Sequence, residues 1–165
     1  TTPQSNQPPC EKRFKKHWGN MSLKLDHQLC FALYSASRQV IQRYTPLLKP
    51  LQLTYTQYIT MLALWEEHPQ TVKALGNKLA LDSGTLTPLL KKLASLGYIT
   101  RERGVDDERL VLIELTPKGL SLREQAKEIP KKIASCFPLS LEAATELSRL
   151  LTLIRQEEQT QTCLK

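Results

Sequence analysis

The sequence predicts a mainly α-helical protein with one small β-hairpin: a winged helix-turn-helix lobe beside a helical dimerisation layer. Three observations lead to this fold class. Two short helical segments are followed directly by two short strand segments, which is the order of a winged helix. Longer apolar helical segments flank this part on both sides. The 165 residues suit one domain, which can bury a core without help from disulfides or metal.

Residues 1–20 are rich in Pro, Gln and Asn and then become basic, so they cannot bury much apolar area. We expect either a disordered basic arm or an extension that precedes a natural start at Met21. The single domain then spans residues 21–165.

The first helical segment is expected over Leu25–Leu48, ended by Pro46 and Pro50. Its apolar residues cover a wide arc, as in a helix buried on two sides, and a second chain is a natural occupant of the second side. With a long helix from Pro117 to about Ser135, interrupted or kinked at Pro130, and a last helix from Ser140 to about Gln159, it forms the dimerisation layer (about 23–48 and 117–160).

The lobe between these helices covers about 54–116. Thr54 and Gln57 fit a capping box, and the helix that follows stops before Pro69. Thr71 opens a short helix, and a second helix ends at Gly97. Strands are expected over 98–103 and 110–115, joined by a turn at 104–107. Thr116 and Pro117 begin the next helix.

The helix before the hairpin has an exposed face of small, polar or basic residues, which suits a helix in the major groove of DNA. These residues are Gly84, Thr87, Pro88, Lys91 and Ser95. Asp82 or Ser83 could cap this helix, or it could start at Thr87. The hairpin carries Arg101, Arg103 and Arg109 beside acidic residues. An Asp there could orient an Arg for the minor groove, or the hairpin could be an ordinary charged one.

Composition narrows the function without deciding it. The net charge of +7 and the pI of about 9.3 are compatible with nucleic acid, and equally with a solvated basic surface. No run of about 18 apolar residues and no secretory pattern occurs, so we expect no membrane span and a cytoplasmic protein.

The four cysteines, Cys10, Cys30, Cys136 and Cys163, form no CxxC motif and no zinc spacing, so we expect no metal and no cofactor. Cys30 could be an inert buried thiol or a reactive one. It shares a helix face with Tyr34, whereas Asp26 one turn away would oppose a thiolate.

Residues 81–109, LDSGTLTPLLKKLASLGYITRERGVDDER, resemble the winged-helix segment of the MarR family of bacterial repressors. LDHQLCFALYSASR and LTYTQYITMLALWE are similar to its organic-hydroperoxide-sensing branch, the OhrR proteins, and the match runs through residues 22–160. The resemblance implies a homodimer that binds double-stranded operator DNA with two winged-helix lobes.

The resemblance also implies site residues. It starts the recognition helix near Asp82 and puts Ser83, Thr85, Thr87 and Pro88 at the major groove, with Lys91 on the same face. It matches Asp107 and Arg109 to the wing-tip pair, beside Arg101 and Arg103 in the hairpin.

For sensing, the resemblance makes Cys30 the peroxide-sensing thiol and organic hydroperoxide the inducer. Tyr34, Tyr44 and Tyr55 match tyrosines that support the thiolate. Cys136 stands where the two-cysteine type of the branch has its resolving cysteine, which implies an intersubunit Cys30–Cys136 disulfide. A small thiol in place of Cys136 stays open, and we expect Cys10 and Cys163 to be incidental.

Two other functions compete with this redox-sensing repressor. A regulator of the same fold could respond to another oxidant, an electrophile or a phenolic ligand. A thiol peroxidase would also use a reactive cysteine, but no thioredoxin-like motif supports turnover, so we expect no enzyme.

Overall fold

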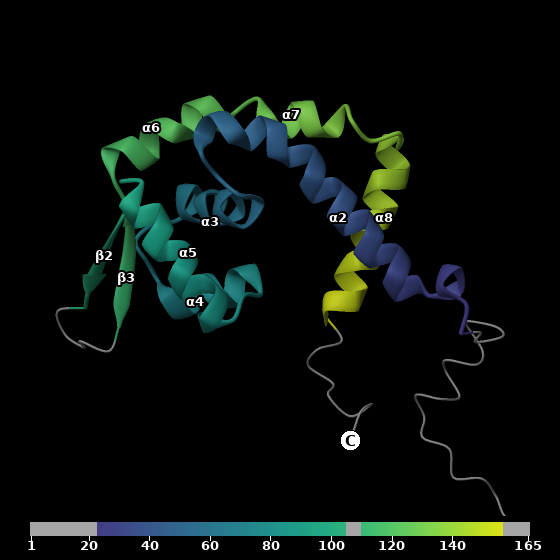
Figure 1. Cartoon of the computed structure of the whole chain (residues 1–165), viewed down its shortest axis with the longest axis horizontal. Coiled ribbons are helices and arrows are strands. Elements are labelled where there is room, and N and C mark those ends of the chain that lie inside the picture. The colour runs from purple at the N-terminus through teal and green to yellow at the C-terminus, as the bar shows by residue number, and fades with distance from the viewer. Residues whose placement is uncertain (1–22, 105–109, 157–165) are drawn as a thin grey trace, which may run out of the picture. The chain divides into compact units, whose positions relative to one another are not determined.

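The computed structural model describes residues 23–104 and 110–156 (Figure 1). They form two compact units. The larger unit is residues 38–137, and the smaller one combines the described residues before 38 with those after 137. Helix α2 (Leu29–Leu48) begins in the smaller unit and ends in the larger one.

The larger unit is a winged helix followed by two further helices. After the short turn η2 (Lys49–Leu51), its elements are α3 (Tyr55–Glu66), β1 (Gln70–Thr71), α4 (Val72–Leu79), α5 (Ser83–Ser95), β2 (Ile99–Arg103), β3 (Val111–Leu115), α6 (Pro117–Ala126) and α7 (Ile129–Ala134). In Figure 1, α3, α4 and α5 lie beside one another and the β2–β3 hairpin projects next to them. We call this hairpin the wing.

The wing belongs to an antiparallel sheet with the strand order β1–β3–β2. Ile99 pairs with Leu115 at the base of the wing, and Arg103 pairs with Val111 towards its tip. The hairpin was predicted, but β1 was not. This third strand is two residues long, places Gln70 opposite Ile113, and is too short to show an alternating pattern.

One apolar core holds the larger unit together. Leucines of α5 point between α3 and α4, and Ile99 and Ile113 bring the sheet into the same cluster. The side chains with almost no exposed surface are Leu48, Met61, Leu64, Leu75, Leu86, Leu90, Leu93 and Ile113. This burial fixes the rotation of α5 about its axis, and therefore fixes which of its residues face solvent.

The predicted helix caps are confirmed. Thr54 and Gln57 form a reciprocal capping box at the start of α3. Thr71 and Thr116 accept hydrogen bonds from the first turns of α4 and α6. Gly97, just after α5, has a φ of 76°, a left-handed conformation in which glycine meets no steric cost.

Helix α2 differs from its prediction in two respects. The segment Leu25–His27 is a separate 3-10 turn, η1, so α2 begins only at Leu29. Pro46 lies inside α2 rather than ending it, because a proline in the last turn removes only one helical hydrogen bond. Of the two alternatives at Pro130, the break is correct: the segment 117–135 holds two helices, and Pro130 lies in the first turn of α7, where a missing N–H costs little.

The smaller unit holds η1, the first part of α2, and α8 (Leu141–Gln156). Ser140 caps α8 by accepting a hydrogen bond from the Ala143 amide, as predicted. The expected end of this helix near Gln159 lies outside the described residues. Within the described part of the chain, no helix has the length and apolar character to cross a membrane.

Gly119, in the first turn of α6, allows a very close backbone approach. A Cβ at this position would lie 2.0 Å from the Tyr98 carbonyl oxygen. We therefore expect Gly119→Ala to lower the free energy of unfolding by about 3 kcal/mol, because the backbone must shift to admit the methyl group. Urea denaturation measures this change. Ser121→Ala on the same helix is the control, and an equal effect of both variants would contradict the steric explanation.

Candidate functional site

Helix α5 presents the exposed face that the sequence predicted. Asp82 is its N-cap and accepts hydrogen bonds from the Thr85 amide and hydroxyl, each at 2.9 Å. These bonds, led by the one from the backbone amide, lower the pKa of the Asp82 carboxyl. The helix thus starts at Ser83, and the alternative start at Thr87 is wrong.

Most of the recognition residues expected on α5 are open to solvent. Ser83, Thr85, Pro88 and Lys91 are exposed, and Thr87 is half-buried. The opposite face is the buried row Leu86, Leu89, Leu90 and Leu93. The exposed face therefore offers hydroxyl groups, a small ring and a cation at the surface of the lobe.

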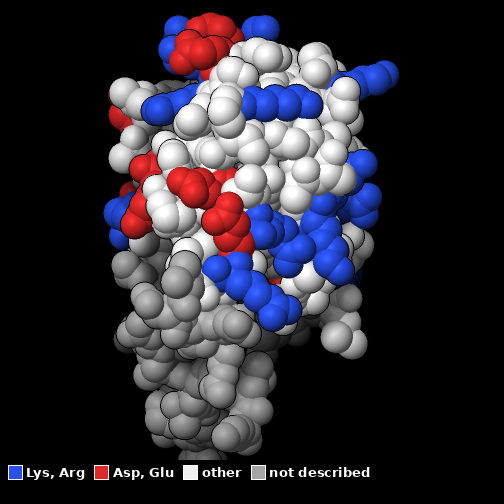
Figure 2. Space-filling view, turned by 90° about the vertical axis from the view of Figure 1, so that its left-hand side faces the viewer, with Lys and Arg blue, Asp and Glu red and all other residues white. Residues whose placement is uncertain are grey.

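The arginines of β2 extend this surface along the wing. Arg101 and Arg103 are two residues apart, so both lie on the side of the strand that buries Ile99 at the base of the wing, while Glu102 lies on the other side. Asp107 and Arg109, expected at the wing tip, lie outside the described residues. Figure 2 shows lysine and arginine side chains gathered on the side of the molecule that carries β2 and β3.

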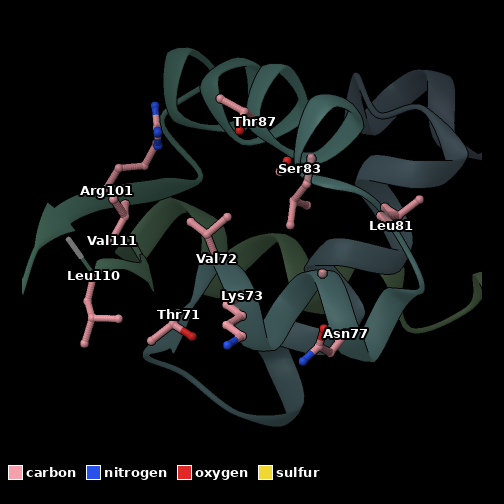
Figure 3. A pocket seen from close by; sticks show the side chains of 12 residues that line it. Thr71, Val72, Lys73, Asn77, Leu81, Ser83, Thr87, Arg101, Leu110 and Val111 are labelled. Atoms are coloured by element: carbon pink, nitrogen blue, oxygen red, sulfur yellow. The ribbon is translucent and has the colours of Figure 1, made fainter.

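A hollow of about 450 Å³ lies between α4, the start of α5 and the wing (Figure 3). Ser83, Thr87 and Arg101 border it, as Figure 3 shows, and Val72 and Val111 give it an apolar wall. Helix α4 contributes Lys73 and Asn77, which sequence reasoning missed. The spacing of these polar residues within TVKALGNKL is the sequence signal that could have predicted them. Helices α4 and α5 and the wing therefore form one concave surface, which we call the reading surface.

Cys30 is the second residue of α2. The Gln28 carbonyl accepts the first helical hydrogen bond, from the Ala32 amide at 3.1 Å, so the thiol lies in the first turn of the helix. Asp26 belongs to the separate turn η1. The N-terminal end of a helix favours negative charge, a factor that the predicted start at Leu25 had hidden. Cys30 and Tyr34 are both exposed in the described chain.

The larger unit brings Tyr44 and Tyr55 together, with ring centroids 4.9 Å apart. Tyr58 continues the row at 5.8 Å from Tyr44, and Trp65 follows at 6.5 Å from Tyr58. The Trp65 indole N–H then donates to the Gly119 carbonyl at 2.9 Å. Sequence reasoning missed Tyr58 and Trp65 as part of this row, because an aromatic residue on a buried helix face reads simply as core.

Burial favours the protonated form of two tyrosines in this row, Tyr44 and Tyr58. It raises the pKa of Tyr44, and the nearby Tyr55 phenol adds to the effect. Burial likewise raises the pKa of Tyr58, with smaller contributions from Tyr44 and Tyr55. A phenol that holds its proton is a hydrogen-bond donor, which is what support of an anion requires.

Cys136 follows α7 and is exposed. Its thiol donates to the Lys132 carbonyl at 3.2 Å. Cys136 belongs to the larger unit together with Tyr44 and Tyr55, whereas Cys30 and Tyr34 belong to the smaller one. Their assembly into one sensing site is part of the proposal below. Among the described residues, no three His, Cys, Asp or Glu side chains form a group that could hold a metal ion.

The fold and the reading surface define a class: a transcriptional regulator of the winged-helix type. Residues 42–128 match the family model of the transcriptional regulators SarA and Rot. The organic hydroperoxide resistance transcriptional regulator of Bacillus subtilis is 49% identical over 133 residues, which cover 80% of this chain and 90% of that protein. The chain belongs to this family of transcriptional regulators, of MarR type and the OhrR branch, and it is not an enzyme.

Solved structures agree with this assignment. Reduced AbfR bound to DNA has a TM-score of 0.72 and 39% identity, and the match covers 82% of this chain and 93% of that one. AbfR with its disulfide formed has a TM-score of 0.58 and 41% identity, covering 79% and 91%. AbfR comes from Staphylococcus epidermidis.

The tyrosine row gives a prediction about pH. The pKa values of Tyr44 and Tyr58 are raised above their ordinary value of 10.0, so the stability that they contribute is complete below about pH 10 and is lost as pH rises further. We expect the free energy of unfolding to fall more steeply above pH 10 in the wild type than in Tyr44→Phe. Chemical denaturation at a series of pH values tests this, and identical slopes would contradict it.

Proposed function

We propose that this protein is a redox-sensing transcriptional repressor that binds a pseudo-palindromic operator as a homodimer. Oxidation of Cys30 by an organic hydroperoxide releases the operator, through an intersubunit Cys30–Cys136 disulfide. The observation that carries the proposal is the tyrosine row. It places protonated phenols at one end and a hydrogen bond to the base of α6, next to the wing, at the other.

The reading surface supports the DNA-binding part. Ser83, Thr85 and Pro88 are small enough to let α5 approach base edges, and Lys91 adds a cation for a phosphate. Arg101 and Arg103 extend positive charge along the wing. The wing-tip pair Asp107 and Arg109 completes this set by the family resemblance. A relative of similar fold, AbfR, is bound to DNA in its reduced form.

Exposed leucines support the homodimer. In the smaller unit, α8 leaves a row of large apolar side chains in solvent: Leu141, Leu147, Leu150, Leu151, Leu153 and Ile154. At the start of α2, Leu29 and Phe31 are also exposed. Soluble proteins rarely leave contiguous apolar surface uncovered, and a second copy would cover these helices in both chains at once.

The sensing chemistry follows from the groups around Cys30. The thiolate attacks the distal peroxide oxygen, the O–O bond breaks, and the alkoxide leaves with a proton as an alcohol. Tyr44 and Tyr55 of the partner subunit, with Tyr34, would donate hydrogen bonds to the thiolate. Leu29 and Phe31 would favour an apolar organic hydroperoxide over hydrogen peroxide.

The second step joins two sulfurs. The Cys136 sulfur attacks the Cys30 sulfenic sulfur, forming the disulfide and releasing water. A disulfide needs Cα atoms within about 7 Å, and a movement of the dimer that brings Cys30 and Cys136 within this distance would change the spacing of the two reading surfaces. The similar chain AbfR has a structure with its disulfide formed, which supports a disulfide step.

Arg101 should contact operator phosphate. Arg101→Ala is therefore expected to weaken operator binding and to reduce the slope of log affinity against log salt by about 1. Glu102→Ala is the matched control, since its side chain lies on the other side of β2. Fluorescence anisotropy across salt concentrations measures both, and equal salt slopes for the wild type and Arg101→Ala would remove Arg101 from the interface.

Cys30 should be required for release but not for binding. We expect Cys30→Ser to hold the operator with wild-type affinity at concentrations of cumene hydroperoxide that release the wild type. Hydrogen peroxide should release the wild type only at higher concentration. If hydroperoxide released the operator from Cys30→Ser as readily as from the wild type, Cys30 would not be the sensor. Cys136→Ser, tested alongside, distinguishes release by disulfide from release by a small thiol.

A further inference from the structure

Arg43 fastens the segment that carries Cys136 to helix α2. Its guanidinium Nη1 donates a short hydrogen bond to the Cys136 carbonyl. The same guanidinium lies 5.4 Å from the centroid of the Phe137 ring, within the range of a cation–π contact. Phe137 in turn packs against the apolar core of the larger unit. One side chain thus holds two consecutive residues at the end of α7.

The Cys136 thiol itself is directed back to its own helix. Its Sγ donates to the Lys132 carbonyl, four residues earlier. The residue is exposed, so the sulfur can be reached by solvent while its backbone stays fixed from the other side by Arg43. Rotation of the side chain breaks only the bond to Lys132, whereas movement of the Cys136 backbone must also break the hydrogen bond from Arg43.

We propose that Arg43 is a positioning residue that acts as a latch on Cys136. The proposal rests on the proposed function, because it concerns the second step of sensing. In the reduced protein, Arg43 keeps the segment 136–137, just after α7, against α2. On this proposal the segment leaves Arg43 as the Cys30–Cys136 disulfide closes, so the latch sets how fast the sulfenic acid is resolved.

The latch would give the sensor a threshold. A Cys30 sulfenic acid that waits for Cys136 can be returned to the thiol by two small thiols: the first forms a mixed disulfide and releases water, and the second reduces that disulfide, so brief exposure to peroxide need not end in the Cys30–Cys136 bond. The first step, attack of Cys30 on peroxide, does not involve Arg43. The two steps should therefore respond differently to substitution of this residue.

The choice of variants follows from the two contacts. Arg43→Met keeps an apolar stem but removes both the hydrogen bond and the cation. Arg43→Lys keeps a cation and a donor but loses the planar group that makes both contacts at once. Arg123→Met, which removes a guanidinium from an exposed position of α6, is the control for net charge.

The experiment mixes the full-length protein, with Cys10 and Cys163 changed to serine, with cumene hydroperoxide. Mass spectrometry of quenched samples follows the sulfenic acid, trapped by dimedone, and the disulfide. We expect Arg43→Met to leave the rate of Cys30 oxidation unchanged and to speed disulfide formation about 3- to 30-fold, from the loss of one charged hydrogen bond and one cation–π contact. Arg43→Lys should fall between, and Arg123→Met should match the wild type.

A second measurement separates the latch from the pairing. Hydrogen exchange of residues 133–139 in the reduced protein should be faster in Arg43→Met. A normal Cys30–Cys136 bond that forms at an unchanged or lower rate in Arg43→Met overturns the latch alone. A wild type that forms no such bond overturns the pairing and the latch together, and unchanged hydrogen exchange shows that Arg43 does not restrain the segment.

Discussion

The geometry of the larger unit depends on the hydrogen bond from the Trp65 indole N–H to the Gly119 carbonyl, which joins α3 to the start of α6. Gly119 packs against the Tyr98 carbonyl, which also accepts a hydrogen bond from the Thr116 amide. Helix α3, the base of the wing and the start of α6 therefore meet at one place. No side chain larger than hydrogen fits there, so the three elements hold a defined geometry.

This junction connects the tyrosine row to the base of the wing. The row runs from Tyr55 through Tyr44 and Tyr58 to Trp65, and each ring contacts the next. A change at the phenols of Tyr44 and Tyr55 can therefore displace α3. Through Trp65, α3 is hydrogen-bonded to Gly119, which packs on the base of the wing. Contact is a physical route for coupling, and the amount of coupling is a matter for measurement.

Local signals in the sequence predicted much of this structure. The helix starts at Thr54, Thr71 and Thr116 could be predicted because capping is a contact between residues close together in the sequence. The helix end at Gly97 could be predicted for the same reason. The recognition face of α5 followed from the spacing of its leucines. The start of α2 did not, since a 3-10 turn and an α-helix carry the same apolar pattern. The sequence could not predict the roles of Arg43 and Trp65, because their partners lie far along the chain. Arg43 donates to the Cys136 carbonyl, and Trp65 donates to the Gly119 carbonyl.

The central claim is that the disulfide, and not peroxide contact alone, releases the operator. The most direct test measures bound operator and Cys30–Cys136 disulfide in the same samples as cumene hydroperoxide is added, and again after dithiothreitol. If the disulfide causes release, the released operator rises in proportion to the disulfide, and operator binding is restored when the bond is reduced. Operator that stays bound to fully disulfide-linked protein would contradict this claim.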